Sequence, residues 1–316
     1  LQAAGMDAVM LTGGQAGIIT DDHFGRARIL KIEPSRIISL IKAGRIPVVC
    51  GFQGMTTEGE FTTLGRGGSD TTAAALGATL TAEMIEIYTD VDGIMTADPR
   101  MVKSAQILEC ISYGEVCQLA HQGAKVIHPR AVEIAMQKNI PLVVKSTFSD
   151  EPGTLITNIG QDENGGTIVS DRIATGVTSL SNIAQIRVNI EAGAAHGSSF
   201  EVFKLMAESC ISVDLINVHP GQIMFTVAGD AAERAVSRLK EGGYQVAVTY
   251  DCAKVSVVGG GMREVPGVMA SFVEALATNK ISILQTVDSH TSISALVKRE
   301  DVQAAAFAYA YYIAEN

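Results

Sequence analysis

The residues best suited to chemistry lie in one glycine-rich segment, TLGRGGSD at residues 63–70, directly before a helical run of small residues. Glycines ahead of a helix let the backbone approach an anion closely. Arg66, Ser69 and Asp70 add a cation, a hydroxyl and a carboxylate, a set that could bind the carboxylate and the ammonium group of an amino acid together. For the glycines alone, a tight turn between a strand and a helix explains the pattern equally well.

A second candidate is TDVDGIMTADPR, residues 89–100, which follows a predicted strand. Its aspartates could position a nucleotide and, through carboxylate oxygens, the magnesium ion that accompanies it. A solvated turn rich in aspartate and threonine is the simpler interpretation.

Isolated polar residues carry less information. Lys125, alone among small and apolar residues in GAKVIHP, could reach a phosphate, although most single lysines are merely solvated. His128 precedes Pro129 at a predicted helix start and is interpreted as structural. The other histidines show no metal-ligand spacing, and no nucleophile–base motif is present, so we assign no metal ligands.

Composition narrows the class of protein. The 316 residues are 47% hydrophobic, enough for two or three domains with their own cores. A formal charge of −10 argues against nucleic acid or an anionic membrane surface as a partner, because both select basic faces. No apolar run reaches the ~18 to 20 residues of a membrane span, and no signal peptide opens the chain. The five cysteines form no CxxC pair, which predicts buried thiols in a reducing cytoplasm.

In the first half of the chain, segments with a strand-like pattern of hydrophobic residues alternate with segments of helical pattern. Short branched runs predict strands at residues 8–11, 27–32, 46–52, 84–89 and 140–146. Helical patterns lie at residues 34–44, from Ser69 onward, and at 112–124 and 128–139. This alternation predicts an α/β fold with a doubly wound, mainly parallel sheet whose ligand loops lie at the carboxyl ends of its strands.

The second half contains an internal repeat. Residues 211–227 align without a gap over 281–297, and helical spacing continues upstream in both copies. Each copy reads as a ferredoxin-like βαββαβ unit. In the first copy, Asp214 and Asn217 could bind an amino group, although polar residues on an exposed strand face are more common. We therefore predict a first domain over residues 1–150, a linker over 151–171, and two repeats over 172–250 and 251–316.

Together the motifs resemble those of one family. PVVCGFQG, TLGRGGSD, TDVDGIMTADPR and GAKVIHP have the order and approximate spacing found in aspartokinases, of the amino-acid kinase superfamily, and the repeat resembles the paired ACT domains that follow. The resemblance implies transfer of the γ-phosphoryl group of MgATP to the β-carboxylate of L-aspartate. That reaction begins the synthesis of lysine, threonine, methionine and diaminopimelate. It also implies feedback regulation by lysine, threonine or diaminopimelate, at least a homodimer, and a cytoplasmic location.

The resemblance assigns roles position by position. Asp70 and Arg66 match catalytic residues, and the aspartate site corresponds to Phe52, Arg66, Gly67, Ser69 and Asp70. The ATP site corresponds to Thr89, Asp90, Met95, Arg100, Lys125 and Val126, although the family often has tyrosine where Met95 stands. The effector site corresponds to Gly197, Ser212, Val213, Asp214 and Asn217. The nearest similarity is to Gram-positive, diaminopimelate-responsive forms, but Ala194 replaces an acidic residue common beside the effector.

Two family motifs, a KFGGTS-like loop and S-x-G-E, are absent from the sequence. We expect both upstream of Leu1, in a longer protein of which this chain is a fragment. A non-catalytic, amino-acid-binding regulatory subunit or an inactive fragment is therefore the first alternative. Another amino-acid kinase with added sensor domains is the second.

Overall fold

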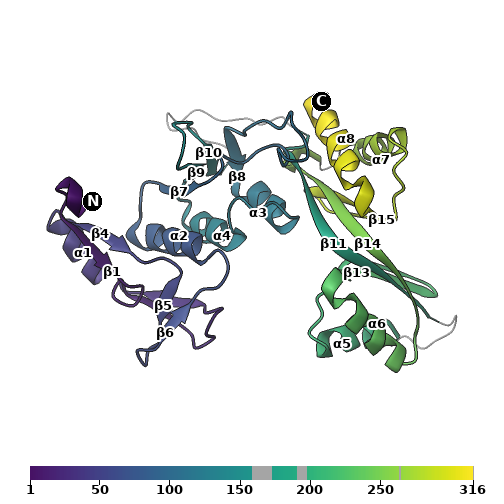
Figure 1. Cartoon of the computed structure of the whole chain (residues 1–316), viewed down its shortest axis with the longest axis horizontal. Coiled ribbons are helices and arrows are strands. Elements are labelled where there is room, and N and C mark those ends of the chain that lie inside the picture. The colour runs from purple at the N-terminus through teal and green to yellow at the C-terminus, as the bar shows by residue number, and fades with distance from the viewer. Residues whose placement is uncertain (159–172, 191–197, 263–264, 316) are drawn as a thin grey trace. The chain divides into compact units, whose positions relative to one another are not determined.

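The computed structural model describes residues 1–158, 173–190, 198–262 and 265–315. The chain divides into two compact units (Figure 1). The first comprises Leu1–Met95 and Ile107–Ser170, and the second comprises Thr96–Gln106 and Asp171–Asn316. None of the described helices is both long and apolar enough to span a bilayer.

The first part of unit 1 combines a parallel strand pair with a small mixed sheet. Strands β1 (Ala8–Leu11) and β4 (Ile46–Val49) pair in parallel, and α1 (Ser35–Lys42) packs beside them. The mixed sheet has the order β3-β2-β5-β6, with bounds Ile29–Ile32, Ile18–Thr20, Gln53–Met55 and Phe61–Thr63. Leu11, Ile18 and Ile37 form the shared core, because α1 turns its apolar stripe inward.

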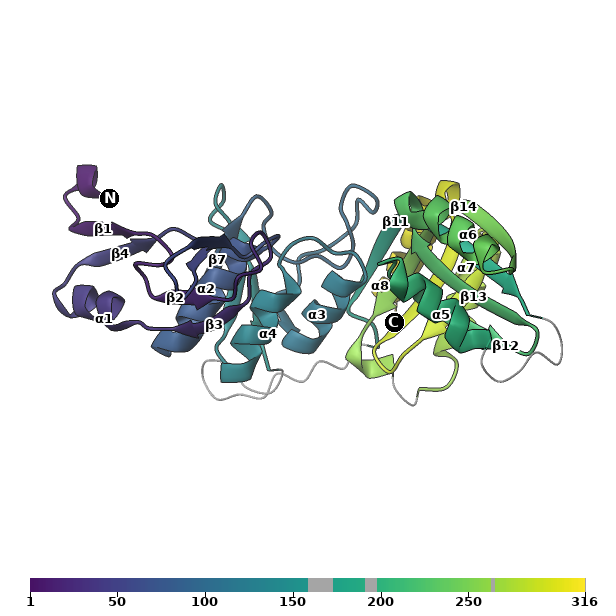
Figure 2. The ribbon, with the colours of Figure 1, turned by 90° about the horizontal axis from the view of Figure 1, so that it is seen from below.

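The second part of unit 1 carries the longer helices. Its sheet has the order β7-β9-β10-β8, with bounds Ile85–Thr89, Leu142–Ser146, Thr154–Thr157 and Cys110–Ser112. The helices are α2 (Gly68–Leu80), α3 (Tyr113–His121) and α4 (Pro129–Lys138). Helix α2 packs along α4 (Figure 2). Ser112 and Glu115 form a capping box that fixes the start of α3.

The predicted α/β architecture is confirmed, since every strand and helix expected in the first half is present. The described strands of unit 1 nevertheless form three separate sheets. The predicted strand at residues 27–32 pairs antiparallel with β2, outside the parallel pairs β1/β4 and β7/β9. Within the range predicted as a linker, Thr154–Thr157 form β10, which is held between β8 and β9 by backbone pairing.

Unit 2 is built on two long strands, β11 (Gly176–Asn189) and β14 (Gln245–Val258), which run side by side between two pairs of helices (Figure 1). Outside them lie β13 (Gln222–Ala228) and β12 (Asp214–His219) on one edge, and β16 (Ser292–Lys298) and β15 (Gln285–Asp288) on the other. The helices are α5 (Ser198–Glu208), α6 (Ala232–Glu241), α7 (Val268–Thr278) and α8 (Val302–Glu315). Short 3₁₀ segments occur at Gln2–Ala4, Gly229–Ala231, Gly260–Met262 and Arg299–Asp301.

The two repeats share the long strands. Residues 183–189 of β11 pair with β13, whereas residues 252–258 of β14 pair with β16. The first repeat therefore shows the predicted βαββαβ order, and the second completes its sheet with the first half of β11. Each repeat has its own buried cluster, one around Phe225 and one around Tyr309.

A polar network links the inner faces of the repeats. The Lys254 ammonium, on a side chain only 5% exposed, lies 2.5 Å from Oδ2 of Asp214. Gln285 of β15 donates to Asn217 of β12 at 2.5 Å and accepts from Gln185 at 2.9 Å. Buried amides are paired in this way because an unsatisfied one costs about 1–3 kcal/mol.

The segment Thr96–Gln106 belongs to unit 2 although the chain on both sides of it belongs to unit 1. Ala97 and Val102 are buried in the cluster around Tyr309. The amide of Val177, on β11, donates to the carbonyl of Thr96 at 2.7 Å. The chain thus leaves unit 1 at Met95, contributes to the second repeat, and returns at Ile107.

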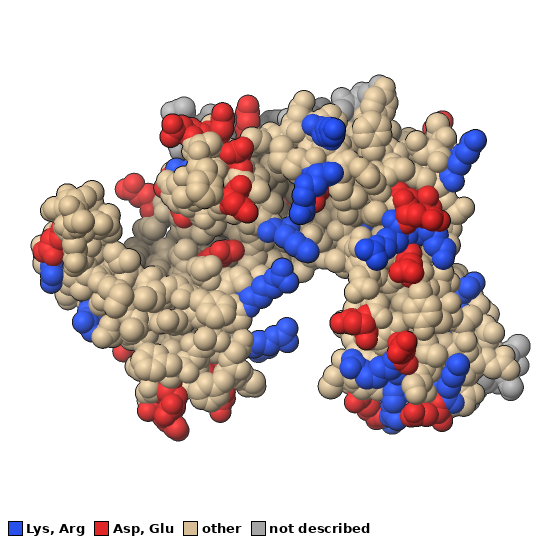
Figure 3. Space-filling view, viewed as in Figure 1, with Lys and Arg blue, Asp and Glu red and all other residues tan. Residues whose placement is uncertain are grey.

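Charged side chains of both signs are interspersed over the face of unit 2 seen in Figure 3. Several form local helix pairs, such as Arg238 with Glu241 at 2.9 Å and Lys204 with Glu201 at 4.0 Å. Such exposed pairs contribute little, about 0–1 kcal/mol each. The stability of the unit therefore rests on its cores and inner network.

Replacing Asp214 by Asn tests the inner network. The change leaves the Lys254 ammonium without its carboxylate, and we expect a loss of about 1–3 kcal/mol, less than for a fully buried pair because the Asp214 side chain is 58% exposed. The control is Glu201→Gln, which breaks an exposed pair and should change stability by less than about 0.5 kcal/mol. Denaturant unfolding followed by circular dichroism gives both values, and an equal effect of the two changes would contradict the network's role.

The same pair predicts a pH dependence. Burial alone raises the pKa of Asp214, but the hydrogen bond from Lys254, the amide of Leu215 and the Lys254 charge together bring the pKa below its ordinary value. The stabilisation is therefore fully present above the ordinary carboxyl pKa of about 3.9 and is lost as the pH falls through the lower folded-state pKa. The stability difference between the parent chain and Asp214→Asn should be full at neutral pH and shrink below about pH 4.

Tyr309 and Tyr113 offer a matched test of buried hydroxyls. Tyr309 is 0% exposed and stacks on Phe272 at 4.1 Å, and among the described residues its hydroxyl has no hydrogen-bond partner. Tyr113 is equally buried, but its hydroxyl donates to the Ile140 carbonyl at 2.6 Å. Tyr309→Phe should leave the free energy of unfolding unchanged or raise it by up to about 1 kcal/mol, whereas Tyr113→Phe should lower it by about 1–2 kcal/mol. Calorimetry distinguishes these outcomes, and the reverse order would be inconsistent with the packing described.

Candidate functional site

The glycine-rich segment forms a loop between β6 and α2. The hairpin β5–β6 separates the loop from the strand predicted at residues 46–52. Gly67 caps α2 with a φ of +69°, in the left-handed region. A Cβ on Gly67 would lie 2.3 Å from Cγ of His128, so a side chain is excluded both by backbone conformation and by space. The loop is thereby pressed against the start of α4.

Phe52 lies between β4 and β5 in the chain and contacts this loop in space. Its φ of +71° places a bulky residue in the left-handed region, which is a strained conformation that clusters at functional sites. Its amide donates to Oγ1 of Thr72 at 3.0 Å, and its carbonyl accepts from the amide of Leu64 at 3.0 Å. The ring is 42% exposed and lies so close to Gly68 that a Cβ there would be 2.6 Å from Cδ2.

The three polar residues of the loop have different surroundings. Arg66 is exposed, and within the described parts of the chain its guanidinium has no polar partner. Ser69 donates its hydroxyl hydrogen to Oδ1 of Asp70 at 3.3 Å. Oδ2 of Asp70 accepts from the amide of His128 at 3.3 Å. A cation, the first turn of α2 and a carboxylate thus lie within one loop, suited to a ligand with both charges.

His128 is structural, as expected, because its Nδ1 accepts from the amide of Arg130 and caps α4 at 3.3 Å. Arg130 itself was missed by sequence reasoning. Its guanidinium reaches the carbonyls of Ala27 at 3.4 Å and Leu64 at 3.5 Å. No local pattern could reveal these contacts, since 103 and 66 residues separate the partners.

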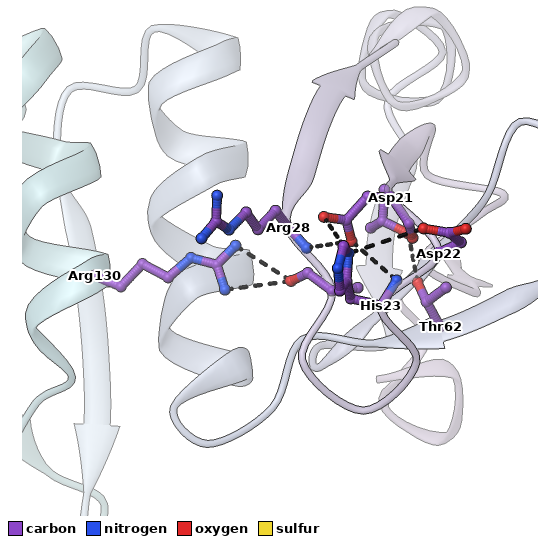
Figure 4. Close-up of polar contacts among 8 residues, drawn as sticks. Asp21, Asp22, His23, Arg28, Thr62 and Arg130 are labelled. Atoms are coloured by element: carbon purple, nitrogen blue, oxygen red, sulfur yellow. Dashed lines mark hydrogen bonds and ion pairs between the residues drawn. The ribbon is translucent and has the colours of Figure 1, made fainter. Parts of the chain in front are cut away.

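Arg130 extends from α4 toward the turn between β2 and β3, as Figure 4 shows. In this turn Asp21 accepts from the amides of Arg28 at 2.9 Å and His23 at 3.3 Å. The hydrogen bond from the Arg28 amide has the largest effect and lowers the pKa of Asp21. Burial raises this pKa by less, and the amide and imidazole of His23 lower it further. Beside the turn, the buried hydroxyls of Thr20 and Thr62 share a hydrogen bond of 2.6 Å. The turn is therefore held by hydrogen bonds, and Arg130 connects it to the glycine-rich loop.

The predicted nucleotide residues are divided between the units. Thr89 ends β7 and donates its hydroxyl hydrogen to Asp90 at 3.1 Å, and Met95 bridges to Ile107. Lys125 is exposed and Val126 half-buried in the connection between α3 and α4.

Arg100 lies in the segment assigned to unit 2. There its guanidinium pairs with Asp98 at 2.7 Å and lowers the pKa of that carboxyl. The described residues contain no group of three or more metal-ligating side chains.

The predicted effector residues lie before and along β12. Ser212 is exposed and Val213 half-buried, whereas Asp214 and Asn217 are already engaged by Lys254 and Gln285. Gly197 lies outside the described residues.

Family models match both halves of the chain: the amino acid kinase family over residues 1–146 and an ACT domain over residues 247–308. Aspartokinase 1 of Bacillus subtilis is 48% identical over 298 residues, covering 94% of this chain and 73% of that protein. The aspartokinase of Corynebacterium glutamicum is 40% identical over 319 residues, covering 97% and 75%.

Solved structures similar to this chain are also aspartokinases. E. coli aspartokinase III in complex with aspartate and ADP superposes with a TM-score of 0.80 at 26% identity, covering 98% of this chain and 71% of that one. The same enzyme in complex with lysine and aspartate gives 0.78 at 27% identity, covering 99% and 71%. With relatives of this identity over nearly its whole length, the chain belongs to the aspartokinase family.

Proposed function

We propose that the chain transfers the γ-phosphoryl group of MgATP to the β-carboxylate of L-aspartate. The observation that carries the proposal is the exposed Arg66 guanidinium, without a protein partner among the described residues, on a loop that also presents Ser69 and Asp70. The aspartokinase III complex with aspartate and ADP supports the same pair of ligands. The amino acid kinase match over residues 1–146 does not favour a purely regulatory chain.

In this proposal, Arg66 binds a carboxylate of aspartate, and the ammonium group lies near Asp70, beside Ser69 and Gly67. Phe52, held at its positive φ, limits the space around the substrate. The β-carboxylate then attacks the γ-phosphorus in line and ADP leaves, so an acyl phosphate forms without a covalent enzyme intermediate. Catalysis consists of positioning and of stabilising the negative charge that spreads over the transferred group.

The nucleotide would lie near Thr89, Asp90, Met95, Lys125 and Val126 in unit 1, and Arg100 remains a candidate by its position in the sequence. Magnesium enters as part of the substrate complex. The carboxylates of Asp90 and Asp92 have the oxygen chemistry that magnesium prefers. Because the reaction uses MgATP and a free amino acid, we place it in the cytoplasm.

Regulation is proposed to act through unit 2. Lysine, threonine or diaminopimelate would bind near Ser212 and Val213, where Asp214 must share its carboxylate between the effector and Lys254. Gly197 remains a candidate by its position in the sequence. The edge strand β12 exposes Ile216 by 45% and Val218 by 52%, which favours pairing with a second chain in at least a homodimer.

Arg66→Ala should weaken aspartate binding strongly and leave nucleotide binding intact. The loss of a charge-assisted, bidentate partner predicts an affinity for L-aspartate lower by about 10- to 100-fold, with MgADP affinity changed less than about twofold. Calorimetric titration of both ligands makes the comparison, and ADP release with MgATP and aspartate gives the turnover. Arg45→Ala, which removes an exposed partner of Asp7 in the same unit, is the control. Undiminished aspartate binding by Arg66→Ala would overturn the assignment.

Val102→Ala tests how unit 2 influences the nucleotide residues. Val102 is 1% exposed and anchors the segment that carries Arg100, so a cavity there should loosen that segment. The amino acid that binds unit 2 should change the affinity for MgATP by a certain factor in the parent chain, which corresponds to a coupling of typically about 1–3 kcal/mol. We expect this factor to be severalfold smaller in Val102→Ala. Val257→Ala, in the same cluster but on β14, is the matched control. Equal losses in both variants would indicate general loosening of unit 2 instead.

A further inference from the structure

Arg130 is the feature of unit 1 that the proposed function leaves unexplained. It is the second residue of α4, and both terminal nitrogens of its guanidinium donate to the carbonyl of Ala27 at 3.4 Å. One of them also donates to the carbonyl of Leu64 at 3.5 Å. Ala27 is 0% and Leu64 3% exposed, so these carbonyls have no access to bulk water as an alternative partner.

The two carbonyls lie at the junction of two segments. Ala27 lies in the turn between β2 and β3, and its amide donates to the carbonyl of Thr63 at 2.9 Å. Leu64 opens the glycine-rich loop, two positions before Arg66. Arg130 therefore ties the turn and the first residue of the loop to α4 with one planar group, a geometry that a lysine ammonium reproduces only in part.

The same end of α4 contacts the loop at two further points. The ring of His128 lies against Gly67, and its amide donates to Asp70. The loop is thus held by one short segment at Leu64, at Gly67 and at Asp70. Arg66, which is exposed, lies between the first two of these contacts.

The charge of Arg130 is not neutralised locally. Within the described residues no aspartate or glutamate forms an ion pair with it. A half-buried guanidinium next to the loop adds positive potential near the first turn of α2, where a carboxylate is favoured.

We propose that Arg130 is a positioning residue for the aspartate site: its guanidinium fixes the Ala27 and Leu64 carbonyls and so sets where Arg66 and Gly67 meet the substrate carboxylate. This inference rests on the proposed function. It adds a residue from α4, and through it the β2–β3 turn, to the support of the site.

The test compares Arg130→Met, which keeps the length of the side chain, with Arg130→Lys. We expect Arg130→Met to weaken L-aspartate binding by about 10- to 100-fold while MgADP affinity changes less than about twofold. Arg130→Lys should recover part of the loss. Arg45→Met is the matched control, because it removes a guanidinium of unit 1 that pairs with Asp7 on the surface. Equal losses for both ligands, unchanged aspartate binding, or no recovery with lysine would overturn the proposal.

Hydrogen exchange without any ligand separates this inference from the proposed function. In Arg130→Met the amides of residues 64–68 should exchange faster than in the parent chain, and those of β11 should not change. If residues 64–68 exchanged at the same rate in Arg130→Met and in the parent chain, the positioning role would be overturned. If the parent chain binds MgADP but not aspartate, the proposed function fails, and the exchange result still decides whether Arg130 holds the loop.

Discussion

The close approach of two helix starts is the constraint on which the site of unit 1 depends. Helix α2 begins at Gly68 and α4 at Pro129, and the ring of His128 occupies the space that a side chain at Gly67 would need. Only glycine satisfies both that space and the positive φ of the cap. Because α2 also packs along α4, the polar residues of the loop are carried on two rigid elements and not on a free turn.

Unit 2 follows a different principle, in which two repeats share their central strands. Since β11 and β14 each serve both repeats, the strands of unit 2 form one six-stranded sheet, and a shift of register in one repeat would move strands of the other. The inner polar network adds pairs that join β12 directly to β15, through Asn217 and Gln285. A displacement of one repeat would therefore be transmitted to the other through the shared strands and through this pair.

Sequence reasoning identified elements with a strong local period and loops with distinctive chemistry. The helix from Pro129 and the strand around Ile87 were predictable because burial imposes the period of each element, whereas the helix from Ser69 was predictable from its run of small residues after the glycines. The glycine-rich loop was found because its glycines precede a helix. The three-residue strands β2, β5 and β6 were missed, since they depend on pairing with distant partners rather than on propensity.

Tertiary contacts account for what sequence could not supply in the site. Arg130 looks like any arginine near a helix start, and only the fold brings it to Ala27 and Leu64. Similarly, the sequence predicts that residues 96–100 continue the candidate nucleotide segment of unit 1, whereas Ala97 and Val102 pack in the core of unit 2. The residues that link parts of the chain carried the weakest local signal, because their partners are remote in sequence.

The excursion of Thr96–Gln106 into unit 2 has a consequence for synthesis. A chain made from its N-terminus presents this segment long before the strands and helices that bury Ala97 and Val102 have been translated. The residues of β11, β14 and α8 that bury the segment all follow it in the sequence, so its burial has to wait for them. The packing of Ala97 and Val102 therefore forms only after the second repeat has been made, although the chain on both sides of the segment belongs to unit 1.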